Sequence, residues 1–223
     1  MGSFILNNTN SESDRGILDF IGKVDNKEDI LFTTSGTTGE PKKVIHTYKD
    51  LIKNIKIKKE LSNTIWGLTY DYTKIAGSQV ILQSYLNKGK LVNLFGKTYS
   101  EVVGLINKYK VTHISATPTF YRLLNGNIFE TVIQATIGGE TVDNNVISQI
   151  EKTFPTAKIT NIYALTEFGT LFTSNSVYFE FSEKISTFTK VEENNIFIKQ
   201  NNEWVNTGDV VEWVGDSKFK IIG

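Results

Sequence analysis

The sequence predicts an α/β fold, in which a mostly parallel sheet is covered by helices and followed by a small antiparallel β subdomain. Up to about residue 175, short apolar runs alternate with helical stretches that begin at capping residues, which is typical of strand–helix–strand units. Beyond Ser176, short apolar runs are separated by Asn, Gly and Asp, as in an antiparallel sheet or barrel. We therefore expect a polar lead-in over residues 1–27, an α/β subdomain over 28–175 and a β subdomain over 176–223.

The individual elements follow from local signals. The lead-in is rich in Asn and Ser and predicts a loose segment. Residues 29–34 predict a short buried strand that runs into a Ser/Thr/Gly loop. Helix starts are marked by Thr47 with Asp50, by Thr98 with Glu101, and by Pro118 after Thr117. The first of these helices would place Leu51, Ile55 and Leu61 on one face.

Further helices are expected after Gly77 and from Asp143 to about Thr153. The remaining strands of the first subdomain are expected at 111–116, 131–137 and 158–163. Those of the second are expected at 177–181, 196–199, 204–205, 210–213 and 219–222.

Composition excludes several classes of function. The 24 basic and 24 acidic residues balance, so no net field recruits nucleic acid or an anionic membrane. The absence of cysteine rules out disulfides and thiolate metal sites, and the two histidines, His46 and His113, lie far apart. No apolar run approaches the ~20 residues of a membrane span, and the first residues lack a secretory signal. We expect a cytoplasmic protein, and His113 is expected to be an inward-facing strand residue.

The most informative segment is Thr34-Ser35-Gly36-Thr37-Thr38-Gly39-Glu40-Pro41-Lys42-Lys43. A strand that ends in glycines and hydroxyl residues can expose backbone N–H groups in a nest, and small side chains let phosphate oxygens approach. The hydroxyls add donors, and Lys42 or Lys43 adds positive charge. The alternative is a polar strand-to-helix loop with no ligand. A kinase-type phosphate loop is disfavoured because G-x-x-x-x-G-K-[ST] is absent.

This segment resembles the T-S-G-T-T-G-x-P-K signature of the acyl-adenylate-forming, or AMP-binding, superfamily. That superfamily includes acyl- and aryl-CoA synthetases, peptide-synthetase adenylation domains and luciferases. Three further elements of the family pattern follow in the family's order, and the resemblance covers about residues 29–223. They are Gly138-Gly139-Glu140, Tyr163-Ala164-Leu165-Thr166-Glu167 and Thr207-Gly208-Asp209.

The resemblance implies a role for each element. Residues Gly138, Gly139 and Glu140 would lie along the adenine of ATP or AMP, and Tyr163 would stack on it. Thr166 would contact the α-phosphate, with Lys42 also at the phosphates, and Glu167 would help to hold Mg²⁺. Asp209 would accept hydrogen bonds from the ribose hydroxyls. The acyl acceptor implied is CoA, a phosphopantetheine on an acyl carrier protein, or an amine.

The chain also departs from the family pattern. Ala164 replaces a glycine and can narrow the acid pocket beside it, and Lys43 replaces a glycine or alanine. The family's N-terminal subdomain is expected to be reduced, and its small C-terminal domain, which supplies a catalytic lysine, to be absent. The sequence therefore predicts a truncated chain with impaired activity.

The acid-binding region can be read in two registers. In one, Tyr70-Asp71-Tyr72-Thr73 matches the F-D-x-S pattern of amino-acid-activating domains, in which the aspartate pairs the substrate ammonium. In the other, Lys74 replaces the histidine of a CoA-ligase motif and would hold a second carboxylate, unless it is a surface lysine. Ala116, at an expected strand end, would lie beside the acid pocket.

Two hypotheses remain open. The first is an enzyme that activates a small carboxylic acid or amino acid with ATP and Mg²⁺, forming an acyl-adenylate. The second is a non-catalytic nucleotide-binding module.

Overall fold

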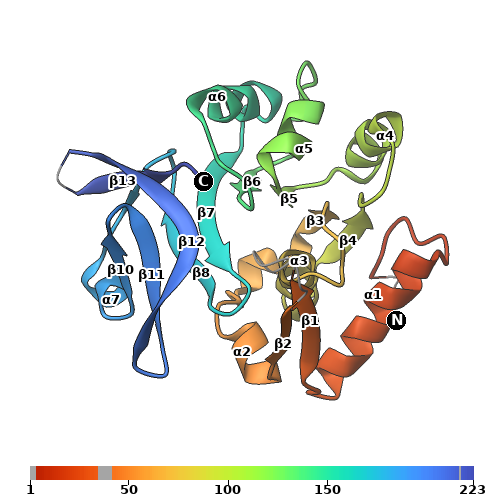
Figure 1. Ribbon diagram of the computed structural model, residues 1–223. Helices are drawn as coiled ribbons and strands as arrows, with labels where there is room; N and C mark the ends of the chain where they lie inside the picture. The colour runs from red at the N-terminus through yellow and green to blue at the C-terminus, as the bar shows by residue number, and fades with distance from the viewer. Residues whose placement is uncertain (1–3, 35–41, 216) are drawn as a thin grey trace.

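The computed structural model describes residues 4–34, 42–215 and 217–223, and its centre is a six-stranded sheet of order β4-β3-β5-β6-β7-β8 (Figure 1). All neighbours are parallel except β8, which runs antiparallel to β7. This confirms the predicted fold class. The strands are β3 (Ile65–Leu68), β4 (Lys90–Asn93), β5 (His113–Ala116), β6 (Gln134–Ile137), β7 (Lys158–Leu165) and β8 (Gly169–Ser174).

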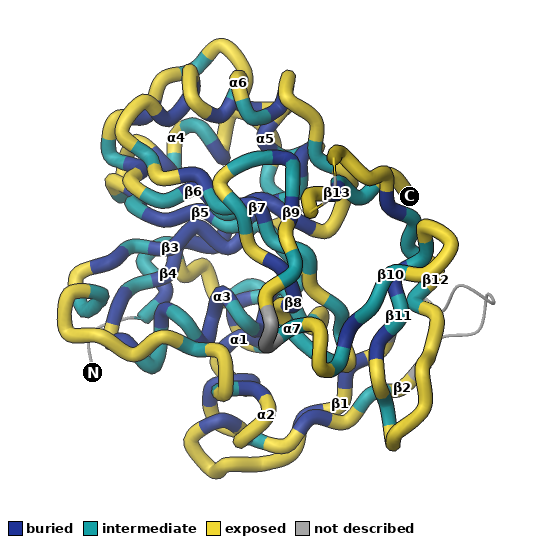
Figure 2. Tube along the Cα trace, turned by 90° about the vertical axis from the view of Figure 1, so that its left-hand side faces the viewer, coloured by how far each residue is buried: buried dark blue, intermediate teal, exposed yellow. Residues whose placement is uncertain are grey.

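The chain reverses its direction across this sheet after β4. Helix α3 (Ile75–Leu86) leads from β3 to β4, and the chain then passes back over β3 to β5. The later connections are α4 (Tyr99–Tyr109), α5 (Pro118–Leu123) and α6 (Asn144–Thr153). Because such crossovers are right-handed, the reversal puts α3 on one face and α4–α6 on the other, as Figure 2 shows.

Each face of the sheet has its own hydrophobic core. One core joins the sheet to buried residues of α4–α6, such as Ile106, Tyr121 and Ile150. The other joins it to α3 through residues such as Ile81. The carboxyl ends of β3 and β5 therefore flank the point where the strand order reverses, which is where open α/β sheets commonly bind ligands.

The predicted helix starts are confirmed. Thr98 and Glu101 form a reciprocal capping box, and Thr117 caps α5 with Pro118 in its first turn. Thr47 accepts from the backbone N–H of Asp50, but α2 covers only Tyr48–Ile52. The expectation that Ile55 and Leu61 continue that helix is wrong, and Leu61 lies in a separate 3₁₀ turn, Lys59–Asn63.

The loose conformation expected for the lead-in, residues 1–27, is wrong where the structure describes it, from residue 4 on. Helix α1 (Glu12–Asp25), capped by Ser11, buries Ile17 and Phe20 in the second core. The polar residues before it hold this segment to the end of β4. Asn7 and Asn93 exchange two hydrogen bonds of 2.8 and 2.9 Å, and the Asn93 amide donates to Asp14 at 2.9 Å.

Asp14 is almost fully buried within this network. Its burial by itself would raise the pKa of the carboxyl group, but hydrogen bonds from Asn93, Thr9 and Ser11 outweigh that effect and lower the pKa. The polar side chains of this segment therefore bind one another instead of water. Composition alone does not distinguish such a packed polar segment from a solvated loop.

Strands β1 (Ile30–Thr34) and β2 (Lys42–His46) form a separate antiparallel pair. Alternate residues, including Phe32 and His46, are buried, while Leu31 and Ile45 face solvent. The expected strand at 29–34 is therefore half-buried. The Ser/Thr/Gly loop at 35–41 lies outside the described residues.

The C-terminal part forms an antiparallel five-stranded sheet of order β10-β11-β12-β13-β9. The runs expected at 204–205 and 210–213 are one long strand, β12. The boundary predicted between residues 175 and 176 stays a prediction, although the change of sheet falls between Ser174 and Phe179. The elements are β9 (Phe179–Glu180), α7 (Glu183–Ser186), β10 (Thr189–Glu192), β11 (Asn195–Gln200), β12 (Glu203–Val214) and β13 (Lys218–Ile221).

Within the described part of the chain, none of the helices has the length and apolar character that crossing a bilayer requires.

Candidate nucleotide site

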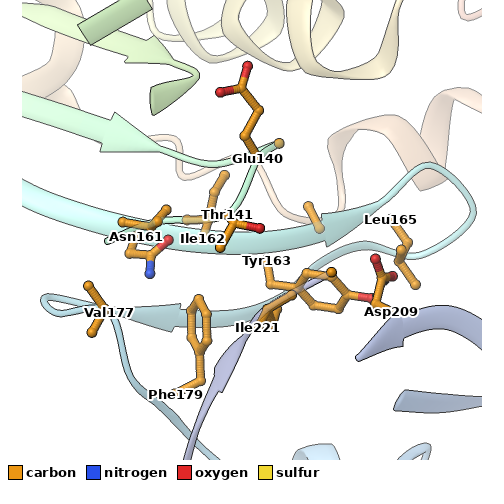
Figure 3. Close-up of a pocket in the computed structure, with 14 residues that line it drawn as sticks. Glu140, Thr141, Asn161, Ile162, Tyr163, Leu165, Val177, Phe179, Asp209 and Ile221 are labelled. Atoms are coloured by element: carbon orange, nitrogen blue, oxygen red, sulfur yellow. Dashed lines mark hydrogen bonds between the residues drawn. The ribbon is translucent and has the colours of Figure 1, made fainter. Parts of the chain in front are cut away.

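A cavity of about 230 Å³ lies where the carboxyl ends of β6 and β7 meet the second sheet (Figure 3). One wall is formed by residues 139–142, which follow β6, and by residues 161–165 of β7. The opposite wall comes from the C-terminal part, including Val177, Phe179, Asp209 and Ile221. The cavity thus combines residues from both sheets.

Tyr163 and Asp209 join the two walls. The Tyr163 hydroxyl donates a hydrogen bond of 2.5 Å to Oδ2 of Asp209, and Figure 3 shows the two groups directed at each other. Burial raises the pKa of the Tyr163 phenol, and the neighbouring carboxylates of Asp209 and Glu167 raise it further. The phenol is therefore a neutral donor, and the carboxylate keeps its second oxygen for another donor.

The position of the Tyr163 ring is set by packing. The ring stacks on Phe172 of β8, with centroids 6.0 Å apart and planes 30° apart. The pairing of β7 with β8 shifts register between Tyr163 and Ala164. The extra residue is Leu171 of β8, so Tyr163 itself stays directly opposite Phe172.

A second bulge positions Asp209. Asn195 pairs with Val210 while Phe197 pairs with Asn206, so three residues of β12 face one of β11. Gly208 has φ +87°, a conformation that favours glycine. Thr207 donates to the Ile196 carbonyl at 3.0 Å and accepts from the Asp209 N–H at 3.1 Å. The Thr-Gly-Asp sequence therefore builds the bulge and directs the carboxylate.

The Gly138-Gly139-Glu140 segment lies at the end of β6. A Cβ on Gly138 would come within 2.7 Å of the Ile162 carbonyl oxygen, so glycine lets this segment lie against β7. Gly139 has φ +82° and lines the cavity. The Glu140 carboxylate accepts from the backbone N–H and the hydroxyl of Thr119, at 3.1 and 2.7 Å. Figure 3 shows this carboxylate pointing away from Tyr163.

Thr166 and Glu167 form the turn between β7 and β8, beside the cavity but not among its lining residues. The Thr166 carbonyl oxygen lies 2.7 Å from Nε2 of His46, and the Glu167 side chain is exposed. Among the described residues there is no group of three His, Cys, Asp or Glu side chains that could hold a metal. A lone exposed carboxylate suits Mg²⁺ that takes most of its ligands from phosphates and water.

The two ends of the predicted phosphate loop lie side by side. Thr34 ends β1, Lys42 begins β2, and the two are directly paired in the antiparallel ladder. The other residues predicted there, Ser35, Gly36, Thr37, Thr38 and Gly39, lie outside the described residues.

A sequence model described as "AMP-binding enzyme" matches residues 11–195. The chain belongs to this family. It is similar to the 4-coumarate–CoA ligase-like 6 of Arabidopsis thaliana, with 24% identity over 72% of this chain and 31% of that protein. It is also similar to bacitracin synthase 3 of Bacillus licheniformis, with 23% identity over 82% of this chain and 3% of that protein. The chain thus spans less than a third of the length of either relative.

Solved structures of synthetases share the AMP-binding fold. An acyl-CoA synthetase (AMP-forming)/AMP-acid ligase II-like protein from Dyadobacter fermentans superimposes with a TM-score of 0.66, at 17% identity over 99% of this chain and 66% of that one. The O-succinylbenzoate CoA synthetase of Bacillus subtilis, solved with ATP and a magnesium ion, gives 0.63, at 21% identity over 86% and 49%.

Of the residues predicted to bind the acid substrate, only one lines the cavity. Ala164 lines the cavity, while Asp71, Lys74 and Ala116 do not. Lys74 donates to the Thr33 carbonyl of β1 at 2.9 Å, and Asp71 accepts from the backbone N–H and the hydroxyl of Thr73. Ala116 is fully buried. Their assignment to the acid in this AMP-binding chain stays a prediction.

Sequence reasoning missed several residues at the site. Val177 and Phe179 of the C-terminal part carry no motif, and they reach the cavity only because the two sheets pack together. Tyr70, the first residue of the Tyr70-Asp71-Tyr72-Thr73 match, lies just beyond the end of β3. Burial raises the pKa of the Tyr70 phenol, so its side chain is neutral at pH 7.

Proposed function

We propose that the chain is the ATP-binding part of an enzyme that activates a carboxylic acid as its acyl-adenylate. The observation that carries the proposal is the Tyr163–Asp209 pair, which lines a cavity between two sheets of an AMP-binding family member. An aromatic ring beside a carboxyl group that has a second oxygen to accept with suits a nucleoside, because the base can stack and the ribose hydroxyls can donate.

The remaining residues take roles around the nucleotide. Gly139 and Glu140 would lie along the base through their backbone, since the Glu140 carboxylate is engaged with α5. Thr166 would contact the α-phosphate, and Lys42 would add positive charge at the phosphates. Glu167 would hold Mg²⁺, which neutralises phosphate charge when bound.

In the proposed reaction a carboxylate oxygen of the acid attacks the α-phosphorus of ATP. A bond forms between that oxygen and phosphorus, the bond from phosphorus to the bridging oxygen of the β-phosphate breaks, and pyrophosphate leaves. Donors fixed around the phosphorus stabilise the charge that develops there. The acyl-adenylate would then pass to CoA, a carrier-protein phosphopantetheine or an amine.

The acid is an amino acid or another small carboxylic acid. The first is supported by the match of Tyr70-Asp71-Tyr72-Thr73 to amino-acid-activating domains, and the second by similarity to a CoA ligase-like protein. The hydrogen bond from Lys74 to β1 favours a role for that amine in holding β1 over a role on a second substrate carboxylate.

The direct test is calorimetric titration of the chain with ATP and Mg²⁺. Asp209→Asn keeps an acceptor for Tyr163 but removes the charge, so it should weaken nucleotide binding by about tenfold, as expected for a lost charged hydrogen bond. Glu212→Gln, which removes an exposed carboxylate from the same strand outside the cavity, should leave the affinity unchanged.

A folded chain that binds no adenine nucleotide, or an Asp209→Asn variant that binds as tightly as the parent, would rule out this site. Pyrophosphate exchange against a panel of amino, aryl and fatty acids then identifies the acid. Tight ATP binding without exchange for any acid would favour a non-catalytic nucleotide-binding module.

A further inference from the structure

His46 makes a long-range contact to the turn that carries Thr166 and Glu167. Nε2 of His46, the last residue of β2, lies 2.7 Å from the carbonyl oxygen of Thr166, 120 residues later in the chain. A carbonyl oxygen can only accept, so Nε2 carries the proton and donates it. The His46 side chain is only 7% exposed, which limits competition from water.

The His46 backbone is fixed by strand pairing, and its ring packs against a neighbouring aromatic residue. In the β1–β2 ladder His46 pairs with Ile30. Its ring lies edge-on to Phe32, with centroids 5.6 Å apart and planes 72° apart. Because the ring is buried and packed in this way, the donor is directed before any ligand binds.

A second contact reaches the same turn from the segment after α2. Gly169, which ends the turn, has φ +74°, and a Cβ there would lie 2.8 Å from the side-chain amide nitrogen of Asn54. The β7–β8 turn therefore packs against the part of the chain that follows the predicted phosphate loop. Of the contacts described here, only the His46 hydrogen bond acts directly on the backbone of Thr166.

We propose that His46 is a positioning residue that fixes the β7–β8 turn so that Thr166 and Glu167 can meet the phosphates of a bound nucleotide. This inference rests on the proposed function. Lys42 and His46 are the two ends of the same strand, so β2 ties the segment next to the phosphate loop to the turn that faces the phosphates. A turn held in this way loses less conformational entropy when the nucleotide binds.

The test compares His46→Leu, which removes the donor, with His46→Gln, whose amide nitrogen can occupy the place of Nε2. His46→Leu should weaken binding of ATP with Mg²⁺ by about five- to tenfold, the effect of one lost hydrogen bond. Binding of adenosine, which lacks phosphates, should stay unchanged, and His46→Gln should restore most of the ATP affinity. Val44→Ala, which trims an apolar side chain two residues earlier on β2, should leave the ratio of the two affinities unchanged.

A second measurement does not depend on the ligand. Hydrogen exchange in the nucleotide-free chain should show faster exchange of the amides of residues 166–170 in His46→Leu, with protection regained in His46→Gln. Equal weakening of adenosine and ATP, or unchanged exchange in the turn, would overturn the inference. If the parent chain binds no nucleotide, the proposed function fails and this role of His46 fails with it. The exchange data then show only whether His46 holds the turn.

Discussion

His113 is a buried titratable residue at the first position of β5, and it packs against Trp66 of the second core. Its ring packs against Trp66 on the neighbouring strand, with centroids 4.7 Å apart, and Nδ1 lies 2.9 Å from the Thr112 hydroxyl. Burial lowers the pKa of the imidazole to about 4. The expectation that His113 faces inward is confirmed, and the low pKa keeps its side chain neutral at pH 7.

The lowered pKa predicts a specific pH dependence of stability. The unfolded chain binds a proton at His113 near pH 6.5, while the folded chain does so only near pH 4, so the stabilising contribution is complete above pH 6.5 and is lost as pH falls through 4. His113→Phe keeps a ring against Trp66 but cannot titrate. As pH falls from 7 to 4, the free energy of unfolding of the parent should therefore drop relative to that of His113→Phe. We expect this relative change to be on the order of 2 kcal/mol, after a reduction for solvent screening.

Urea unfolding of both chains at several pH values measures this difference. A gap between parent and variant that stays constant from pH 7 to pH 4 would contradict the lowered pKa.

At the scale of elements, helix α1 packs on the segment predicted to bind the acid. A Cβ on Gly16 would lie 2.2 Å from the ring of Tyr72, so the helix and the ring are in close contact. Gly22, on the exposed side of the same helix, has nothing within 4 Å of a Cβ. These two glycines provide a matched pair, because alanine improves helix propensity equally at both.

We predict opposite effects of the two alanine substitutions. Gly22→Ala should stabilise the chain by about 0.5–1 kcal/mol through helix propensity and the unfolded state. Gly16→Ala gains the same propensity but must displace the Tyr72 ring, so it should be about 1–3 kcal/mol less stable than Gly22→Ala. Denaturant unfolding gives both values, and Tyr72→Ala should abolish the difference. Equal stabilisation at both positions would mean that α1 does not pack on this segment.

At the scale of the whole molecule, strand β8 belongs to both halves. It pairs with β7 in the six-stranded sheet, and its residue Phe172 lies in the core of the second sheet. The Phe172 ring contacts Phe219 at 5.1 Å and Phe181 at 5.2 Å between centroids. The core of the second sheet therefore depends on the first sheet, and the two should unfold together.

Phe172→Ala should separate the unfolding transitions of the two sheets. Loss of a buried phenylalanine costs about 3–5 kcal/mol, and here the loss falls on the second sheet. Single-tryptophan chains that keep Trp66 in the first sheet or Trp213 in the second can follow each half. The parent should show coincident transitions, and Phe172→Ala should unfold at Trp213 first.

Phe154→Ala is the control, because Phe154 is equally buried but lies in the core under α6. It should lower stability without separating the transitions. Coincident transitions in Phe172→Ala would show that β8 does not couple the sheets.

Much of the fold could be predicted because its signals are local. The capping box of Thr98 with Glu101 involves side chains within one turn, and the strand–helix alternation is visible over short windows. The sequence analysis missed strands β2, β3, β4, β8 and β10. Short apolar runs such as Ile65–Leu68 do not by themselves distinguish a strand from a piece of helix.

Helix α1 was missed although it has local signals, since Ser11 caps it and Ile17, Phe20 and Val24 lie at helical spacing. The polar residues before it, which bind Asn93 from about 80 residues away, gave the segment the composition of a loop.

The sequence by itself determined the candidate residues of the site, including Tyr163, Thr166, Glu167 and Asp209, because motifs that resemble those of the AMP-binding family occur in the family's order. The need for glycine in those motifs is also local, because the positive φ of Gly139 and Gly208 depends on the residue at that position alone. Only the tertiary structure decided how these groups are engaged. Three hydrogen bonds at the site join residues that are 21 to 120 positions apart in the chain. They connect Tyr163 with Asp209, Glu140 with Thr119 of α5, and His46 with Thr166. The spacing of residues along the sequence does not predict such contacts, because they depend on how the packed sheets bring distant parts of the backbone together.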